Sequence, residues 1–338
     1  FAAIGFIEYL NLSGYSYMVY GTLDQVRMKR LCHATMTNVW NSTKGDWLKM
    51  KHEWNDRIEA AGEKHGVANP KFASREGAWQ GSTGMANIVL QTRELKDDQI
   101  VNDKSKTLNA NVSVLDPVAC EVILRFFMPK NGCRVYNPFG GGVQMGFVTG
   151  WYGYEYLSSE IRQNQCDSNN AICQDFYNTK WIKSDTSKFT PKQNYDLIFT
   201  CPPYYKVEKY LDYDGCPPEG ELNSLPTYED FRDMLFKGYD NALSVLNDNC
   251  FFVVMIGDSR DSKGAYYGVE AEHELFFKSR GLLIYNKITY LECEFTRLAQ
   301  AKVTLNTRKF PKREQKILVF YKGDPSKIKE LYPPIGRL

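Results

Sequence analysis

The stretch Tyr-Asp-Leu-Ile-Phe-Thr-Cys-Pro-Pro-Tyr-Tyr at residues 195–205 decides the fold class of this chain. Its apolar run predicts a buried strand, and two consecutive prolines end that strand because proline has no N–H to donate to a sheet. The turn that follows carries aromatic rings at the carboxyl end of a strand, the edge where open α/β sheets bind ligands. Pro-Pro-Tyr is also an ordinary loop sequence, so a purely structural turn is the alternative.

A glycine-rich turn upstream favours the functional interpretation. Residues 133–142 read Cys-Arg-Val-Tyr-Asn-Pro-Phe-Gly-Gly-Gly, which predicts a short strand and then a turn whose backbone a ligand can approach closely. We expect a short helix over 143–150 and a second strand over 151–156. That strand places Glu155 near its end, where a carboxylate can accept both hydroxyls of a ribose. The alternative is a turn between buried strands, with Glu155 merely solvated.

Together the two motifs resemble motifs I and IV of the S-adenosylmethionine-dependent DNA amino-methyltransferases, which methylate adenine N6 or cytosine N4. The nearest resemblance is to phage-type and prophage-type DNA modification methylases with Thr-Cys-Pro-Pro-Tyr, here residues 200–204. It covers roughly residues 110–326 and includes Gly-Asp-Ser-Arg-Asp at 257–261. The resemblance implies an α/β fold, a Rossmann-like class I methyltransferase with a mostly parallel seven-stranded sheet and a smaller, mainly helical N-terminal region.

The same resemblance implies roles for individual residues. The cofactor, S-adenosyl-L-methionine, would be held by Asp116, Asn137, Pro138, Phe139, Gly140, Gly142, Glu155 and Asp185. In this assignment Glu155 holds the ribose, Asp185 contacts the adenine amine, and Asp116 backs the cofactor ahead of motif I. The target-base pocket would be formed by Cys201, Pro202, Pro203 and Tyr204. As alternatives, Asp116 and Asp185 are simple helix-cap or turn residues.

Two residues depart from the family pattern. Asn137 stands where motif I usually has Asp, so it brings no charge to the cofactor. Cys201 stands where motif IV has Asp, Asn or Ser, and a thiol is a weak acceptor. The principal acceptor for the target amine would then be the Pro202 carbonyl. Cysteine is closest in shape to the Ser of cytosine N4 enzymes, so cytosine is slightly favoured over adenine as the target base. A nucleophilic Cys201, as in carbon-5 chemistry, is disfavoured because that cysteine follows a proline, whereas this one precedes it.

Length and composition set the organisation of the chain. With 338 residues and 43% hydrophobic content, we expect one large domain and a smaller one. We assign 1–108 to a mainly helical region with possible DNA recognition, 109–326 to the catalytic domain and 327–338 to a C-terminal tail. Helices are expected at 23–40, 44–62, 227–246 and 269–279. Further strands are expected at 250–256, 284–293 and 316–322.

The charge pattern limits where nucleic acid can bind. Because the net charge is only +2, any DNA footprint must be local. The best candidate is the basic segment 295–316, whose proposed phosphate contacts are Arg297, Lys302, Arg308, Lys309, Lys312 and Arg313. A solvated basic hairpin is the alternative. The long loop 206–225 after Pro-Pro-Tyr is a candidate lid over the site.

The cysteines, the histidines and the lengths of the apolar runs exclude several classes of protein. Nine cysteines without Cys-x-x-Cys spacing indicate reduced thiols and a cytoplasmic location, in a bacterium or a phage-infected cell. Four histidines without clustered ligand spacing predict no metal site, and no apolar run approaches the ~20 residues of a membrane span. The remaining alternatives are an RNA amino-methyltransferase, transfer of a group larger than methyl, and an inactive nucleic-acid-binding protein that keeps the fold.

Overall fold

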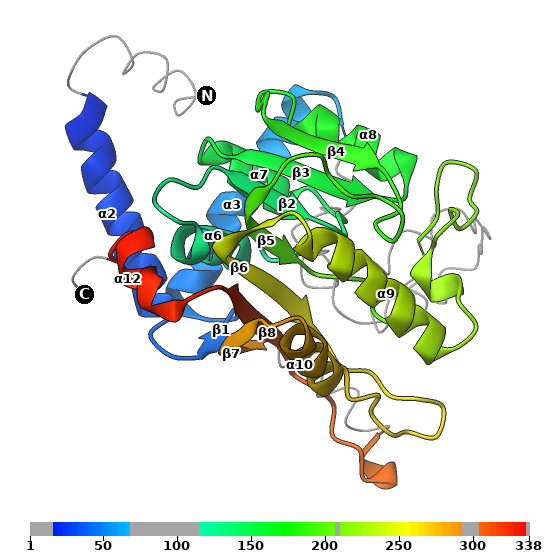
Figure 1. The fold of residues 1–338 in the computed structure, drawn as a ribbon. Coiled ribbons are helices and arrows are strands. Elements are labelled where there is room, and N and C mark those ends of the chain that lie inside the picture. The colour runs from blue at the N-terminus through cyan, green and yellow to red at the C-terminus, as the bar shows by residue number, and fades with distance from the viewer. Residues whose placement is uncertain (1–15, 68–114, 207–209, 293–303, 336–338) are drawn as a thin grey trace.

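The computed structural model describes residues 16–67, 115–206, 210–292 and 304–335. They form an eight-stranded sheet in the order β1–β7–β8–β6–β5–β2–β3–β4 (Figure 1). The strands are β1 (Val39–Asn41), β2 (Arg134–Asn137), β3 (Glu155–Glu160), β4 (Thr179–Lys183), β5 (Tyr195–Thr200), β6 (Leu246–Ile256), β7 (Leu283–Leu291) and β8 (Glu314–Lys322). The helices are α2 (Ser16–Ala34), α3 (Gly45–Lys64), α6 (Pro117–Phe127), α7 (Gln144–Trp151), α8 (Gln163–Ile172), α9 (Tyr228–Leu243), α10 (Val269–Ser279) and α12 (Ile328–Leu331), with 3-10 turns η1 (Leu222–Ser224), η2 (Leu305–Thr307) and η3 (Pro325–Lys327).

The strand directions confirm a mostly parallel α/β sheet. Only β8 is antiparallel, and it lies between β6 and β7. The expected strand count of seven was wrong by one, because β1 adds a strand parallel to β7 at the edge of the sheet. The expected helix over 23–40 ends at Ala34, and Trp40 instead lies in β1 with 4% of its surface exposed. Pairing with β7 and burial of the indole therefore outweigh the helical spacing.

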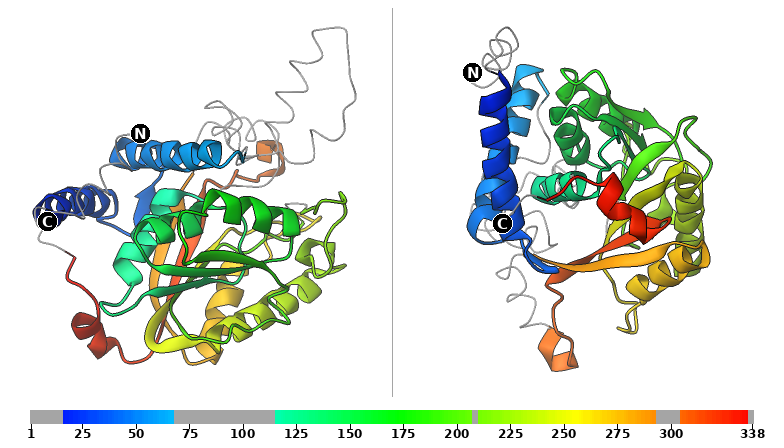
Figure 2. Two further views of the ribbon diagram at one scale, coloured as in Figure 1. Left: turned by 90° about the horizontal axis from the view of Figure 1, so that it is seen from above. Right: turned by 60° about the vertical axis from the view of Figure 1, so that its left-hand side comes forward.

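Helices cover both faces of the sheet, as the view from above in Figure 2 shows. Successive side chains of a strand point to opposite faces, and β6 demonstrates this. Phe251 and Val253 belong to the core beneath α3, α6, α7 and α8. Phe252 and Val254 belong to the second core, beneath α9 and α10. Burial on both faces explains why the central strands are continuous apolar runs rather than alternating ones.

Strand β3 begins later in the chain than the sequence predicted, and this changes which of its residues reach the site. The expected strand over 151–156 was wrong: α7 extends to Trp151, and β3 occupies Glu155–Glu160. Trp151 stays helical because its ring packs at 5.9 Å against Trp54 of α3. Gly153, with φ +78°, then reverses the chain into β3. Glu155 is thus the first residue of the strand rather than one near its end.

Helices α2 and α3 dock on α6 through one buried carboxylate. Glu121 of α6 has no exposed surface, and it accepts hydrogen bonds from Arg27 Nε (2.7 Å), Trp54 Nε1 (2.6 Å) and Tyr152 OH (2.6 Å). A buried carboxylate needs such partners, since an uncompensated charge is costly to bury. The N-terminal helices are therefore bound to the α/β core by a specific polar contact as well as by apolar packing.

Two further observations concern the ends of the chain and the membrane question. β1 shares the sheet of the α/β core, and Tyr332 beyond α12 is buried with its OH donating to Asn249 O at 2.9 Å. The division into 1–108, 109–326 and 327–338 stays a prediction.

Within the described residues, none of the helices has the length and apolar character needed to cross a membrane.

Candidate active site

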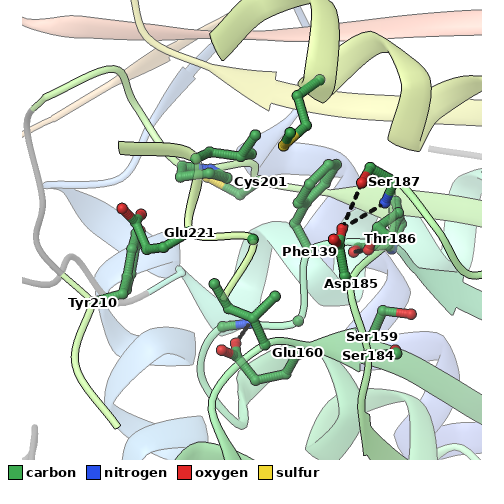
Figure 3. A pocket seen from close by; sticks show the side chains of 18 residues that line it. Phe139, Ser159, Glu160, Ser184, Asp185, Thr186, Ser187, Cys201, Tyr210 and Glu221 are labelled. Carbon is green, nitrogen blue, oxygen red and sulfur yellow. Dashed lines mark hydrogen bonds between the residues drawn. The ribbon is translucent and has the colours of Figure 1, made fainter. Parts of the chain in front are cut away.

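A cleft opens at the carboxyl ends of the central strands, at the point where the strand order reverses. β2 pairs with β3 on one side and with β5 on the other, so the loops after β2 and β5 diverge and leave a crevice. Its space is about 600 Å³, counting the open mouth. Figure 3 shows the lining residues, which are Pro138, Phe139, Gly140, Gly141, Ser159, Glu160, Ile161, Ser184, Asp185, Thr186, Ser187, Cys201, Pro203, Tyr210, Gly220, Glu221, Leu222 and Met234.

The turn after β2 is held by the side chain of Asn137. Its Oδ1 accepts from Phe139 N at 3.1 Å, and its Nδ2 donates to Tyr156 OH at 3.2 Å. Asn137 is 2% exposed and does not line the cleft. The amide therefore shapes the turn, while Pro138, Phe139 and Gly140 form the wall that a ligand would meet.

The glycines of this turn have different structural requirements. A Cβ on Gly140 would lie 2.5 Å from Ser158 Oγ and 3.0 Å from Ser159 O, so only glycine lets the turn approach β3 this closely. Gly141 needs its positive φ of +57° instead. Gly142 does not line the cleft, and a Cβ there would meet Gln144 Oε1 at 2.5 Å.

The acid that lines the cleft is Glu160 rather than Glu155, so the structure does not bring Glu155 to the place where an acid was expected. Glu155 begins β3 at the opposite end from the cleft and pairs with Arg134 at 3.0 Å. Glu160 ends β3 and lines the cleft with 7% of its surface exposed. Its Oε2 accepts from Gly141 N at 2.8 Å, and its Oε1 pairs with Arg162 Nε at 2.9 Å. Because Oε1 also accepts from Arg162 N at 3.0 Å, the carboxylate is held rigidly beside the glycine turn, and Oε2 keeps one lone pair for a ligand hydroxyl.

Asp185 lies in the cleft and also stabilises its own turn. Its Oδ1 accepts from Ser187 N at 2.9 Å and from Ser187 Oγ at 2.7 Å. Its Oδ2 lies 3.4 Å from Lys188 Nζ. The two interpretations of Asp185 from sequence are thus compatible, since a turn residue here also faces the cleft.

Asp116 is a structural cap, and its assignment to the cofactor was wrong. It begins α6 and accepts from Val118 N at 2.8 Å, Trp47 Nε1 at 3.1 Å and Tyr290 OH at 2.6 Å. Lys51 Nζ lies 2.9 Å away. Burial works to raise the pKa of Asp116, but Lys51 and the hydrogen bonds outweigh it and hold that pKa below its usual value. Asp116 is 3% exposed and does not line the cleft.

The Cys-Pro-Pro-Tyr turn after β5 separates two cavities. Cys201 and Pro203 line the cleft. Pro202, Pro203 and Tyr204 line a smaller cavity on the other side, among aromatic side chains. Tyr204 OH donates to Gln315 Oε1 at 2.6 Å and lies 3.5 Å from Cys201 Sγ. The sequence motif therefore forms one edge of the cleft, with its tyrosine fastened to β8.

The loop expected as a lid does border the cleft. Tyr210, Glu221 and Leu222 line it, and Asp212 fixes the loop by accepting from Gln163 N and Asn164 N, both at 3.0 Å, at the start of α8. Burial works to raise the pKa of Asp212, but these backbone donors, with Tyr213 N and Lys183, lower it to about 2. The carboxylate of Asp212 is therefore charged at any pH near 7. Movement of the loop stays a prediction.

The basic segment is only partly described. Arg297 and Lys302 lie outside the described residues. Arg308 is exposed at the end of η2, and Lys309 is half-buried. Lys312 Nζ donates to Asp258 O at 2.8 Å, and Arg313 Nε donates to Glu292 O at 3.3 Å. Of the four, none lines the cleft, and their contact with phosphate stays a prediction.

Several lining residues were not anticipated from sequence, namely Ser159, Glu160, Thr186, Tyr210, Glu221 and Met234. For Glu160 a signal existed, because the run Tyr-Leu-Ser-Ser-Glu at 156–160 has an acid at its carboxyl end. For Glu221 no local pattern indicates the role. It reaches the cleft because the loop folds back across the strand ends.

Comparison with known proteins gives similarity of fold. No protein-family model matches the chain, and no curated protein matches it in sequence. Among solved structures it is similar to TrmN from Thermus thermophilus, with 11% identity over 62% of this chain and 49% of that chain and a TM-score of 0.38.

Two other solved structures are similar to a comparable degree. A TehB-like SAM-dependent methyltransferase from Corynebacterium glutamicum shares 17% identity over 70% of this chain and 97% of that chain, with a TM-score of 0.37. An O-methyltransferase from a trans-AT PKS multienzyme of Brevibacillus brevis, in complex with S-adenosyl-L-homocysteine, shares 12% identity over 72% of this chain and 80% of that chain, with a TM-score of 0.41. Similarities this weak carry no information on ligand or substrate, so the function proposed below depends on the cleft itself.

Proposed function

We propose that this chain transfers a methyl group from S-adenosyl-L-methionine to an exocyclic amine of a DNA base, with cytosine N4 slightly ahead of adenine N6. One observation carries the proposal: a single cleft joins the glycine turn after β2, Glu160, the polar turn after β4 and the edge formed by Cys201 and Pro203. Those features come from four neighbouring strand ends. A nucleoside-type ligand needs contacts of each of these kinds.

The residues present fit such a cofactor. Gly140 lets the turn after β2 pack closely on β3 and so fixes the wall that the cofactor would meet, and Glu160 offers an acceptor for a ribose hydroxyl. Asp185, with Ser184 beside it, offers acceptors and donors for an adenine edge. Phe139 and Met234 supply apolar surface for the base. When bound, the cofactor would supply a methyl group already activated on a sulfonium.

The chain's own contribution is to position the amine. Cys201 lines the cleft, and the next residue, Pro202, lines the adjoining smaller cavity. The carbonyl of Pro202 would accept a hydrogen bond from the amine and so direct the nitrogen lone pair towards the methyl group. Positioning at short range is the main requirement of such a transfer. Tyr204 would stack on the target base, and a base in a duplex must first leave the helix to reach this edge. Arg308, Lys309, Lys312 and Arg313 are the described cations proposed to contact phosphate.

A transfer assay on matched substrates tests the proposal. Purified protein is incubated with methyl-labelled cofactor and either duplex DNA, single-stranded DNA or RNA, and label in the nucleic acid is counted. We expect incorporation into DNA, and loss of it in a Tyr204→Ala protein that still binds cofactor. Incorporation into RNA alone would replace the DNA substrate by RNA. Cofactor binding without transfer to either would favour an inactive protein on this fold.

A further inference from the structure

The lid loop places a buried carboxylate in the cleft wall without a cation. Glu221 is 6% exposed, and its Oε2 accepts from Ser224 Oγ at 2.9 Å. Its Oε1 is buried and has no hydrogen-bond partner among the described residues. Burying a carboxylate with one unpartnered oxygen costs free energy, because desolvation penalises its charge. Among the described residues, no cation lies within ion-pair distance to offset that cost.

The other two acids of the cleft each have a cation within ion-pair distance, although Asp185 Oδ2, like Glu221 Oε1, has no hydrogen-bond partner among the described residues. Glu160 pairs with Arg162 at 2.9 Å, and Asp185 lies 3.4 Å from Lys188. Glu221 forms no ion pair within the described part of the chain. The nearest lining neighbour in sequence, Leu222, is apolar, and Met234 adds further apolar surface. The charge of Glu221 is therefore available to a ligand in the cleft.

Its position indicates which part of a ligand it would meet. Figure 3 shows Glu221 and Tyr210 on one side of the cleft and Asp185 on the other. Cys201 and Glu160 lie between the two sides in that view. Both positive charges of S-adenosylmethionine, the sulfonium and the ammonium, lie on its 5′ substituent, so this is the part of the ligand that an unpaired carboxylate in the cleft wall complements. Asn137 carries no charge and lies outside the cleft, so it does not offer an alternative anion there.

From this arrangement we propose that Glu221 is the anionic partner of the positive charge on the 5′ substituent of the bound cofactor, either the ammonium or the sulfonium. The inference rests on the proposed function, because it takes the ligand of the cleft to be S-adenosylmethionine. It also gives the lid loop a second role. Glu221 already lines the cleft in the structure, so the loop supplies this counter-charge without a further movement.

Binding of four ligands to wild-type and Glu221→Gln protein tests this assignment, measured by calorimetry. The ligands are S-adenosylmethionine, S-adenosylhomocysteine, deaminated S-adenosylhomocysteine and 5′-methylthioadenosine, and the last two carry no positive charge. Glutamine keeps the shape and the acceptor for Ser224 but removes the charge. We expect Kd to rise about tenfold to a hundredfold for S-adenosylmethionine and less than about twofold for the two ligands that carry no positive charge. A rise for S-adenosylmethionine alone identifies the sulfonium, and an equal rise for S-adenosylhomocysteine identifies the ammonium.

Two control variants separate charge from structure. Ser224→Ala removes the hydrogen bond to Glu221 within the loop but keeps the charge, so it should leave the preference for charged ligands intact. Glu219→Gln removes a charge from the same loop at a side chain that is 92% exposed, and it should change no affinity by more than about twofold. If Glu221→Gln fails to fold, the wild-type comparison remains: either S-adenosylhomocysteine binds at least about tenfold more tightly than its deaminated form, or S-adenosylmethionine binds at least about tenfold more tightly than S-adenosylhomocysteine.

Three results would overturn the assignment. If Glu221→Gln weakens binding of all four ligands equally, the residue contacts the nucleoside that they share. If it changes none of the affinities, the residue contacts neither the nucleoside nor the charged substituent. In both cases the proposed function stands. If the wild-type protein binds none of the four ligands, the proposed function fails and this inference fails with it.

Discussion

Replacing Gly140 by alanine should damage the cleft without removing any functional group. The added Cβ would lie 2.5 Å from Ser158 Oγ, 3.0 Å from Ser159 O and 3.2 Å from Trp181 Cδ1. Ordinary contact begins near 3.4 Å, so the overlap with Ser158 is 3.4 − 2.5 = 0.9 Å and that with Ser159 is 0.4 Å. Ser158 Oγ cannot turn away freely, since it donates to Asn137 O at 3.0 Å.

The expected loss of stability in Gly140→Ala follows from these contacts. Losing the Ser158 hydrogen bond costs about 1 kcal/mol, and overpacking a dense site costs about 1–3 kcal/mol. We expect a loss of about 2–4 kcal/mol in the free energy of unfolding, or roughly 3–6 °C in Tm for a chain of this size. Because Gly140 N also donates to Ser159 O at 2.7 Å, the turn must move away from β3. Cofactor affinity should therefore fall about tenfold, an expectation for a wall displaced by a few tenths of an ångström.

Calorimetry with S-adenosylhomocysteine and thermal unfolding provide the two readouts. Gly66→Ala is the control, because Gly66 has φ +66° and open space around its Cβ position. It should cost about 1 kcal/mol of strain and leave the Kd unchanged. The reasoning is refuted if Gly140→Ala has both wild-type Tm and wild-type affinity, since the overlaps would then carry no cost.

Three other predictions concern stability and positioning. Glu121→Gln removes the buried carboxylate beside Arg27, which keeps its ion pair with the partly exposed Glu53, and should cost about 1–3 kcal/mol in urea unfolding; a cost below about 0.5 kcal/mol would contradict this. Burial lowers the pKa of His273 to about 4, so the unfolded chain binds its proton first. Stability should then fall by up to about 3 kcal/mol between pH 6.5 and 4, and an equally steep fall in His273→Gln protein would assign it to other groups. Gln315→Ala removes the acceptor of Tyr204 OH and should slow transfer about tenfold at unchanged cofactor Kd; a weakened Kd would instead indicate a change in the cleft.

Much of the fold could be predicted because its signals are local. The double proline ends β5, and the apolar runs give β5 and β6. Helix α9 begins as expected, with Thr227 Oγ1 accepting from Asp230 N at 3.1 Å. Each of these depends on a few adjacent residues. The cleft residues Phe139, Gly140 and Cys201 were found for the same reason, since each lies directly after a strand that sequence alone locates.

The errors arise where tertiary contacts override local pattern. Glu155 was chosen because the end of α7 read as a strand, and the packing of Trp151 on Trp54 shifts β3 so that Glu160 reaches the cleft. Asp116 was chosen for its place before the glycine turn, but Tyr290 and other distant residues surround it. Glu221 gave no signal, because only the return of the loop across the sheet edge brings it to the site.

The most direct test of the central claim is mass spectrometry of nucleosides from the DNA of cells that express this protein, beside cells that express Tyr204→Ala. Our account predicts a mass increase of one methyl group on deoxycytidine or deoxyadenosine in the first sample, and its loss in the second. The same measurement reads the base and the size of the transferred group. DNA nucleosides of unchanged mass, from cells in which the wild-type protein is folded and binds cofactor, would contradict the assignment of this cleft to DNA methylation.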